Sequence, residues 1–559
     1  MLRYNSFLTL ISIPLLLCLT AAKPTIASSC HGSPNGLPIV DLGYQVQQAT
    51  VFNTTGSYYS FNNIRFAASP IGNLRFDAPQ KPAVDRSSVQ TGKQSRICPQ
   101  AEPDWNAIAA QFLPRYLAGE HQFNYSSFQP ATASLIPPDN RTTEDCLFLD
   151  VSVPKKIFNN AGHGPGAPVV VWIYGGGFTF GSKQDSGNPA GLIHASNEGI
   201  IFVALNYRLG AFGWLSGPTF QMNGTANIGL LDQRMGLDWV QEHIAKFGGD
   251  PKRVTIMGES AGGGSIVHHI TAWGGGKEPS PFAQAIIQSP GFFPVASNNQ
   301  QEDSFNQFLE ILNVSTIQEA RSLSTEKLQD ANTKLVRGAP YGQFTVGPAV
   351  DGGYVPALPV QLLLHGQFDH NIRVMVGHNA NEGLLFTTPF LPNASAVEQD
   401  LVSNLPTLKS FPKTFNHIIQ DLYPRESAST LYNNPIGRSA AFKSDVAFLS
   451  NAFAVRAAFS NRAYGYLFNI PPSLHGQDVP YTFFNGPSPS VPFPHVAAAM
   501  QDYITQFIMT GNPNTPRQPF FGQYGANATI QVLNPANISF GFDPAANERN
   551  SWWQKVLYA

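Results

Sequence analysis

The 559-residue chain predicts an α/β fold, a large, mixed and mostly parallel sheet flanked by helices and carrying helical insertions. Two observations favour this class. After Cys146, short apolar runs typical of buried strands alternate with segments of helical periodicity, and this alternation is typical of a parallel sheet with right-handed crossovers. In addition, the apolar run 254–257 ends in a glycine-rich turn that leads into a predicted helix. Because such sheets carry their sites at the carboxyl ends of strands, we expect chemistry at this turn.

The N-terminal part of the predicted sheet lies between residues 38 and 82, where short strand-like runs alternate with turn residues. The runs 44–47 and 58–61 predict a small antiparallel start to the sheet. The segment from Cys98 to Cys146 follows and is rich in aromatic residues. A long aromatic segment of this kind is either a lid over a site or a packed surface excursion, and the sequence leaves both open.

Strands at 169–174 and 200–206 precede a helix that begins near Asn227. Apolar residues recur along that helix at steps of seven, three, four and three, so they share one face: Leu230, Leu237, Val240, Ile244 and Phe247. The run Gly-Gly-Asp-Pro at 248–251 predicts its end.

The second half of the chain continues the alternation. The helix after the glycine-rich turn is expected to reach about Trp273, and a final helix is expected at 496–510. The predicted strands are 285–288, 372–377 and 463–468. The predicted helical insertions are 297–338 and 396–459.

The composition excludes several classes of function. The chain has 34 Lys and Arg against 36 Asp and Glu, so it lacks the basic surface that a nucleic-acid partner requires. Charged residues make up only 13%, about half of the usual share. The surface therefore needs another source of solubility.

The N-terminus indicates secretion. Residues 1–22 carry one charge, Arg3, then an apolar stretch from Phe7 to Leu19 and small residues, which is typical of a signal peptide cleaved between about residues 22 and 27. An uncleaved membrane anchor is the alternative, disfavoured because the stretch is short and contains Pro14. Residues 28–559 show no linker and are expected to form one domain.

Eight Asn-x-Ser/Thr sequons follow the predicted signal peptide. In a secreted protein these are acceptors for glycans, which solubilise a surface that is poor in charge. The sequons are Asn53, Asn124, Asn140, Asn223, Asn313, Asn393, Asn527 and Asn537.

The cysteines allow one internal disulfide. Cys18 lies in the signal peptide, which leaves Cys30, Cys98 and Cys146, an odd number. We pair Cys98 with Cys146, because Cys30 sits in a Gly/Pro/Ser-rich terminus. Closing this loop stabilises the fold by about 4 kcal/mol in the chain-entropy model.

The glycine-rich turn matches the nucleophile-elbow pattern G-x-S-x-G, with Gly258 and Gly262 flanking Ser260. In that motif the serine hydroxyl projects from the end of a strand, beside the N-terminus of the next helix. The pattern alone also fits a plain turn, so it needs a base, an acid and an oxyanion hole to indicate catalysis.

Two later residues complete a Ser-acid-His arrangement. A serine hydroxyl needs a base within hydrogen-bond reach and a third group that orients the base. Glu382 and His475 each follow a predicted strand, in the chain order Ser, acid, His that this type of enzyme uses. Two other carboxylates compete for the acid role. Glu259 adjoins the serine but is expected to point elsewhere and to act through its field, and Asp351 precedes glycines that indicate a structural turn.

Donors for the oxyanion are expected from the glycine-rich run 175–178 and from Ala261. The run ends a predicted strand upstream of the serine, and Ala261 follows the serine itself. His268 and His269 are neighbours on a helix and diverge, so they do not predict a metal site. No metal and no cofactor is expected.

Several stretches together resemble the type-B carboxylesterases, the family of cholinesterases and fungal lipases, over nearly the whole mature chain. The matching stretches are 144–151 (EDCLFLDV), 172–178 (WIYGGGF), 206–213 (NYRLGAFG), 227–234 (NIGLLDQR), 247–251 (FGGDP), 258–263 (GESAGG), 381–383 (NEG) and 510–513 (TGNP). The resemblance implies an α/β-hydrolase fold. It also implies that Ser260, Glu382 and His475 form the triad and that Cys98 and Cys146 form a disulfide. The oxyanion hole that it implies consists of Gly176, Gly177 and Ala261. By the same resemblance Ser289 and Asp478 lie behind the triad, near His475.

The chain departs from the family at three points. Pro290 follows Ser289 where the family commonly has glycine, no cysteine follows Cys146, and the loop 473–478 matches mainly at its histidine and its acidic residue. These differences concern the substrate more than the mechanism.

Taken together, the sequence predicts a secreted, glycosylated carboxylic-ester hydrolase that works through an acyl-serine intermediate. The expected partner is a small ester with an apolar acyl or aryl group, with a lipid interface as a further candidate, and the oligomeric state is left open. Two alternatives stand beside hydrolysis. One is acyl transfer to an acceptor other than water in a biosynthetic pathway, and the other is a non-catalytic recognition module on the same fold.

Overall fold

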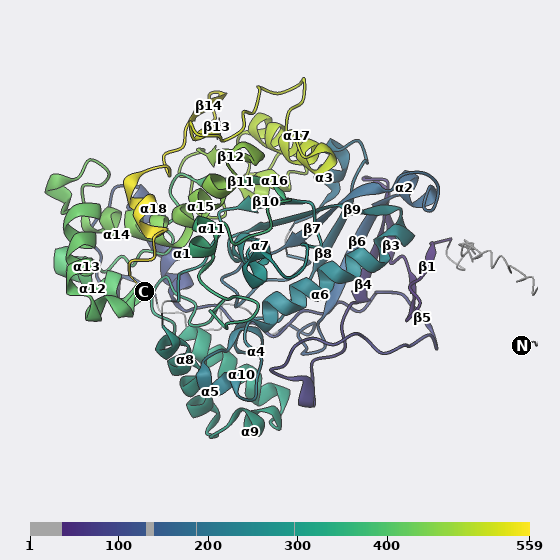
Figure 1. The fold of residues 1–559 in the computed structure, drawn as a ribbon, viewed down its shortest axis with the longest axis horizontal. Helices are drawn as coiled ribbons and strands as arrows, with labels where there is room; N and C mark the ends of the chain where they lie inside the picture. Colours follow the sequence, from purple (N-terminus) through teal and green to yellow (C-terminus); the bar gives the residue numbers. More distant parts are fainter. Residues whose placement is uncertain (1–35, 130–138, 186, 296, 559) are drawn as a thin grey trace, which may run out of the picture.

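A mixed sheet of eleven strands forms the centre of the computed structural model, which describes residues 36–129, 139–185, 187–295 and 297–558 (Figure 1). The predicted signal peptide and Cys30 lie outside these residues. The strand order is β14-β13-β12-β11-β10-β9-β7-β8-β6-β4-β3. The strands are β3 Val51–Asn53, β4 Tyr58–Arg65, β6 Phe148–Pro154, β7 Ala167–Ile173, β8 Ile201–Leu205, β9 Gly249–Glu259, β10 Gln284–Gln288, β11 Arg373–Asn379, β12 Ala463–Phe468, β13 Thr529–Leu533 and β14 Ile538–Phe542.

The sheet is parallel in its middle, from β8 through β7, β9, β10, β11 and β12 to β13, and antiparallel at both ends. The central strands are apolar and buried along nearly their whole length, as expected for parallel strands covered on both faces. The predicted α/β class is confirmed.

Helices flank the sheet and form the two insertions (Figure 1). Their bounds are α1 Trp105–Leu117, α2 Lys155–Asn159, α3 Ala190–Ala195, α4 Gly210–Trp214, α5 Pro218–Gln221, α6 Ile228–His243, α7 Ala261–Ile270, α8 Asn298–Leu312, α9 Ile317–Arg321, α10 Thr325–Arg337, α11 Pro359–Leu364, α12 Ala394–Asn404, α13 Pro412–His417, α14 Pro435–Ser444, α15 Ser450–Phe459, α16 Val479–Thr482, α17 Pro494–Thr510 and α18 Glu548–Trp553. Along α6 and the 3₁₀ turn after it, all five residues of the predicted apolar face are buried. The chain then turns through Gly248, whose φ of +88° suits glycine.

The expectations for the two ends of the chain hold only in part. The antiparallel start of the large sheet is confirmed for β3 and β4, but β1 (Ile39–Asp41) and β2 (Val46–Gln48) pair with β5 (Val89–Gln90) in a separate sheet. The helix at 494–510 is not the last element, since β13, β14 and α18 follow it.

The segment between Cys98 and Cys146 is closed by a disulfide, with a Cα–Cα distance of 5.0 Å. Its helix α1 packs inward through Trp105 and Phe112, which are buried. The described part of the segment is therefore largely a packed excursion, although Tyr125 is 68% exposed.

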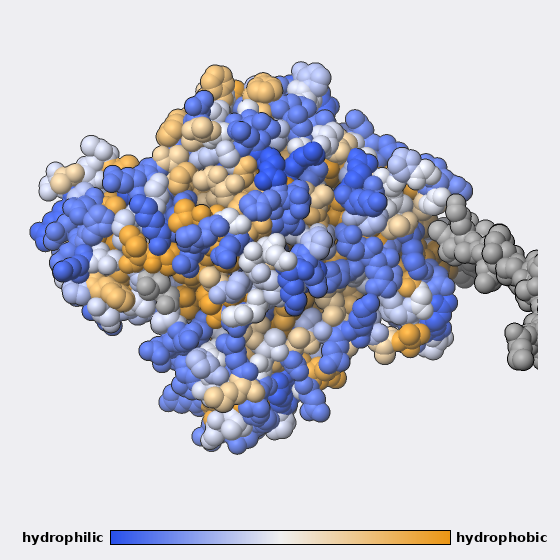
Figure 2. Space-filling model, viewed as in Figure 1, coloured by the Kyte–Doolittle hydropathy of each residue, from blue (hydrophilic) through white to orange (hydrophobic). Residues whose placement is uncertain are grey.

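The face viewed in Figure 2 is mainly hydrophilic, with scattered apolar residues. Some of these lie over the β13–β14 hairpin at the edge of the sheet, where Phe540 and Phe542 of β14 are exposed. None of the helices in the described ranges has the length and apolar character that crossing a bilayer requires.

Candidate active site

Ser260 occupies the sharp turn between β9 and α7. Its φ of +57° and ψ of −124° lie in a region that non-glycine residues rarely adopt. Glycines flank Ser260 because backbone atoms of the neighbouring strand β7 already fill the space that their side chains would need. A Cβ atom on Gly262 would lie 2.1 Å from the carbonyl oxygen of Ile173, and one on Gly258 would lie 2.7 Å from the same atom. The turn therefore presents the serine at the carboxyl end of a central strand, as the sequence predicts.

His475 and Glu382 meet Ser260 at this edge of the sheet. His475 Nε2 lies 2.7 Å from Ser260 Oγ, and His475 Nδ1 lies 2.6 Å from Glu382 Oε2. Glu382 follows β11 and His475 follows β12, so neighbouring parallel strands deliver both side chains. The three groups form a continuous chain from hydroxyl through imidazole to carboxylate.

The Glu382 carboxylate is fully buried and held on its other oxygen. The backbone N–H of Asn379 and the hydroxyl of Ser289 each donate to Oε1 at 2.6 Å. These two donors fix the carboxylate, which in turn fixes the plane and tautomer of the His475 ring.

Glu259 lies closer to the histidine than expected. Its Oε1 is 3.4 Å from His475 Nε2, so the expectation that it points elsewhere was wrong. Burial and the charges of nearby carboxylates raise the pKa of Glu259 to about 8, against the attraction of His475. Burial lowers the pKa of His475, but the negative charges of Glu259 and Glu382 outweigh it, and the net pKa lies above the ordinary 6.5.

Asp478 supports the histidine loop without touching the histidine. The Asn379 side-chain amide donates to the backbone oxygen of Leu474 at 2.7 Å and to Asp478 Oδ1 at 3.4 Å. Gln288 and Tyr466 both donate to Asp478 Oδ2 at 3.3 Å. Burial raises the pKa of this carboxyl to about 6. The network ties the residue before His475 to the sheet.

The predicted oxyanion donors lie on two segments that meet at the serine, the glycine run after β7 and the start of α7. Gly176 and Gly177 have φ of +100° and +59°, and a Cβ on the preceding Gly175 would lie 2.8 Å from Ser260 Cβ. Ala261 is the first residue of α7, where backbone N–H groups have no partner within the helix. Within the described ranges, no hydrogen bond is donated by the N–H of Gly176 or Gly177. This leaves N–H groups available beside the hydroxyl.

Ser260 opens into a cavity of about 420 Å³. Aromatic rings form much of its wall: Phe178, Trp214, Phe292, Phe293, Phe344, Phe386 and Phe448. The rings of Phe386 and Phe448 have centroids 5.1 and 4.4 Å from that of His475, so they also pack the histidine in place. Sequence reasoning missed these residues, which come from separate loops and helices.

The competing residues have structural contacts. Asp351 accepts hydrogen bonds from the backbone N–H groups of Gly353 and Val355 and from the Asn227 amide, so it closes a turn. His268 bonds to a helix carbonyl, whereas His269 bonds to Tyr354 and Gln233. In the part of the chain that the structure describes, no three His, Cys, Asp or Glu side chains gather as a metal site would need.

The eight sequons differ in exposure. Seven of the asparagines are exposed: Asn124, Asn140, Asn223, Asn313, Asn393, Asn527 and Asn537. Asn53 is half-buried in β3, and its amide nitrogen donates to the Tyr58 hydroxyl at 3.0 Å.

The fold and the arrangement around Ser260 agree with comparisons to known proteins. The model of the carboxylesterase family matches residues 45–540. The chain belongs to the carboxylesterase family. Among its relatives, carboxylesterase patB of Penicillium expansum is 39% identical over 545 residues, which are 93% of this chain and 96% of that protein.

Two further matches are a lipase and an esterase of fungi. A secreted lipase of Arthroderma benhamiae is 33% identical over 438 residues, covering 74% of this chain and 83% of that protein. The crystal structure of Aspergillus niger EstA matches with a TM-score of 0.78 at 26% identity, covering 94% of this chain and 99% of that chain. The expected α/β-hydrolase fold and the enzyme class, a carboxylic-ester hydrolase, are thereby confirmed.

Proposed function

We propose that this carboxylesterase is a secreted serine hydrolase that cleaves small esters through an acyl-Ser260 intermediate, with His475 as base and Glu382 as its orienting acid. The observation that carries the proposal is the unbroken hydrogen-bond chain from Ser260 Oγ to Glu382 Oε2, with distances of 2.7 and 2.6 Å. Serine hydroxyls become nucleophilic at neutral pH when a base and an orienting group lie at such distances.

In the first half of the reaction, Ser260 Oγ attacks the ester carbonyl carbon while His475 Nε2 takes the hydroxyl proton. The carbonyl oxygen becomes an oxyanion, which the N–H groups of Gly176, Gly177 and Ala261 stabilise. The tetrahedral intermediate then collapses. The bond to the leaving alcohol breaks, His475 gives its proton to that alcohol, and the acyl group stays on Ser260.

In the second half, water attacks the acyl carbon while His475 takes a proton from it. The second oxyanion occupies the same donors, the bond to Ser260 breaks, and His475 returns the proton to the serine oxygen. The acid leaves and the hydroxyl is restored. Glu382 stabilises the imidazolium in each half.

The setting of the enzyme follows from the N-terminus and the sequons. We take residues 1–22 as a signal peptide, cleaved between about residues 22 and 27, and residues 28–559 as one catalytic domain. Support comes from the secreted lipase relative and from seven exposed sequon asparagines. The aromatic wall beside Ser260 favours an ester with an apolar acyl or aryl group, presented free in water or at a lipid interface.

The test is labelling with a fluorophosphonate followed by peptide mapping by mass spectrometry. We expect a single label on the peptide that carries Ser260, together with loss of ester hydrolysis and no label after Ser260→Ala. A label on a different serine, or full activity of the Ser260→Ala variant, contradicts the assignment. Sequencing the N-terminus of the protein from a culture medium tests the cleavage site.

A further inference from the structure

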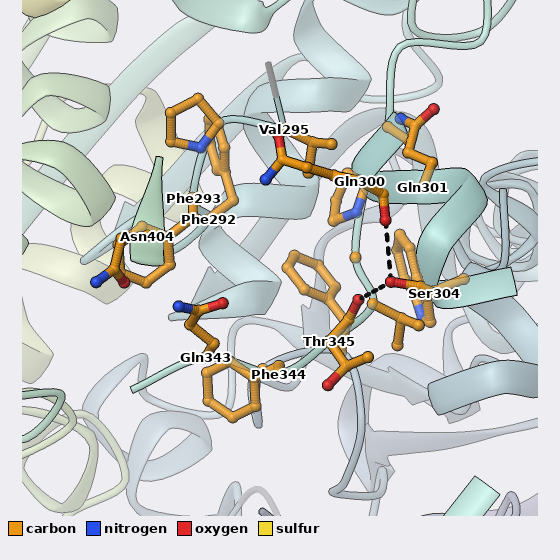
Figure 3. A pocket seen from close by; sticks show the side chains of 18 of the residues that line it. Phe292, Phe293, Val295, Gln300, Gln301, Ser304, Gln343, Phe344, Thr345 and Asn404 are labelled. Carbon is orange, nitrogen blue, oxygen red and sulfur yellow. Dashed lines mark hydrogen bonds between the residues drawn. The ribbon is translucent and has the colours of Figure 1, made fainter. Parts of the chain in front are cut away.

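The cavity at Ser260 has polar walls as well as aromatic ones. Figure 3 shows Gln300, Gln301 and Ser304 of α8 on one side of it, Asn404 at the end of α12 on the other, and Gln343 beside Phe344 between them. An aromatic cavity that held only hydrocarbon would gain nothing from these amides, because burying an unpaired polar group is unfavourable.

The amides of α8 are unpaired. The side-chain amides of Gln300 and Gln301 make no hydrogen bond to any residue that the structure describes, and the amide oxygens of both are shielded from solvent. Gln301 is only 6% exposed. Because buried amides are normally hydrogen-bonded, an unpaired amide that lines a cavity indicates a ligand that supplies the missing hydrogen-bond donor.

The opposite wall repeats the pattern. Asn404 is 5% exposed, and its amide nitrogen donates to the Asp400 carbonyl at 2.7 Å, whereas its Oδ1 has no partner within the described ranges. The Gln343 amide donates to the Ser403 carbonyl at 3.0 Å, which joins the loop of Phe344 to the end of α12. Unpaired amide oxygens thus come from two separate elements.

The charge of the lining residues and the volume of the cavity restrict the class of substrate further. No Lys or Arg belongs to the described lining, and its one carboxylate, Asp303, lies on an exposed position of α8. A substrate with a carboxylate or phosphate would find no cation there. The volume of about 420 Å³ lies in the lower part of the range for small-molecule sites, about 300–1,000 Å³.

We infer that the substrate is a small, uncharged ester that carries a hydroxyl group away from its scissile bond. Its ring or unsaturated part packs against the aromatic wall, and its hydroxyl donates to the amide oxygen of Gln300 or Gln301, after a turn of that amide about its terminal bond. This inference rests on the proposed function, since it assumes that the ester is cleaved at Ser260, and it names the substrate class of that site.

The test uses ester pairs that differ only in –CH₂OH against –CH₂CH₃. One pair has the group on the acyl half, as p-nitrophenyl 4-(hydroxymethyl)benzoate and 4-ethylbenzoate, and one has it on the alcohol half, as 4-(hydroxymethyl)benzyl and 4-ethylbenzyl acetate. We expect kcat/KM to favour the hydroxylated member of at least one pair by about fivefold or more, the effect of one net hydrogen bond.

Variants assign that preference to the amides. In Gln301→Leu and in Gln300→Leu we expect the ratio of kcat/KM for the hydroxylated ester to kcat/KM for the ethyl ester to fall toward one. Gln300 is half-buried, so its replacement is the milder change to the fold. Asn306→Leu is the matched control, because Asn306 is exposed on the same helix and outside the lining, and it should keep the preference.

Three results overturn the inference: equal kcat/KM for both members of both pairs, preference for the ethyl members, or preference for a 4-carboxylate analogue. A preference unchanged in both glutamine variants also overturns it. Fluorophosphonate labelling of the wild-type protein distinguishes failure of this inference from failure of the proposed function. If Ser260 is labelled and the hydroxyl preference is absent, the inference alone fails, whereas absence of the label removes the proposed function first.

Discussion

The Ser289 hydroxyl donates a hydrogen bond of 2.6 Å to Oε1 of Glu382, the carboxylate oxygen that does not contact His475. Hydrogen bonds to charged groups contribute about 1.5–3 kcal/mol, and this one acts on the group that stabilises the imidazolium in the proposed mechanism. We therefore expect Ser289→Ala to lower kcat about tenfold with little change in KM, measured on p-nitrophenyl acetate. Ser196→Ala is the control, because Ser196 is a buried serine that bonds only to its own helix region. An equal loss in both variants would indicate a general packing effect.

Replacing Glu382 with glutamine should reduce kcat by about 10³-fold or more while the fold stays intact. The oxygen of the introduced amide could still accept from Asn379 N–H and Ser289, but the amide nitrogen would then face His475 Nδ1. The amide favours the tautomer with its proton on Nε2, where it cannot accept from the serine. Steady-state kinetics together with circular dichroism check this. Near-normal turnover in a folded variant would remove Glu382 from the proposed triad.

The parts of the structure that the sequence predicted best are those set by local patterns. Buried parallel strands are apolar runs, so β12 matches its predicted range at 463–468. The turn at Ser260 could be predicted because the glycines that it requires, Gly258 and Gly262, stand beside the serine in the sequence. By contrast, β14 lies at the edge of the sheet with exposed and half-buried residues, and its short sequence has no such run. The strand β14 was missed for this reason.

The site was predicted only where a motif marks it. Glu259, the last residue of β9, lies 3.4 Å from His475, and no sequence pattern predicts this approach. The cavity wall was not predictable either. The chain has 40 Phe, and only the packing of distant loops decides that Phe344, Phe386 and Phe448 meet beside the serine.

Glu259→Gln should move the acid limb of the pH profile of kcat/KM to lower pH. In the proposed mechanism His475 must be neutral to take the serine proton. Burial lowers the pKa of His475, but the charges of Glu259 and Glu382 raise it above 6.5, so the base form appears only at higher pH. Without that charge the pKa falls and activity persists at lower pH, by about one unit for a neighbouring charge. Glu242→Gln, at an exposed carboxylate, is the control. An unchanged or upward-shifted limb in Glu259→Gln contradicts the prediction.

Gly262→Ala should destabilise the elbow. The added Cβ would lie 2.1 Å from the Ile173 carbonyl oxygen, which belongs to a central strand and has no room to move. We expect a loss of about 1–3 kcal/mol and little residual activity. Gly276→Ala is the matched control, because a Cβ added there would have no atom within 4 Å and the backbone does not require glycine. Apparent Tm at one fixed scan rate compares the two, and equal Tm values would show that the elbow tolerates the methyl group.

We expect Asn53 to be the sequon that carries no glycan when the chain is expressed through a secretory pathway. Its amide nitrogen, the atom to which a glycan is attached, donates to the Tyr58 hydroxyl at 3.0 Å, and its Oδ1 accepts from Gly56 N–H at 2.8 Å. Attachment there would break the turn between β3 and β4, whereas the other seven asparagines are exposed. Enzymatic deglycosylation in ¹⁸O-labelled water, followed by peptide mass spectrometry, reads each site as a labelled aspartate. We expect the label at exposed sequons and unmodified Asn53, and a glycan on Asn53 would show that this hairpin is modified before it folds.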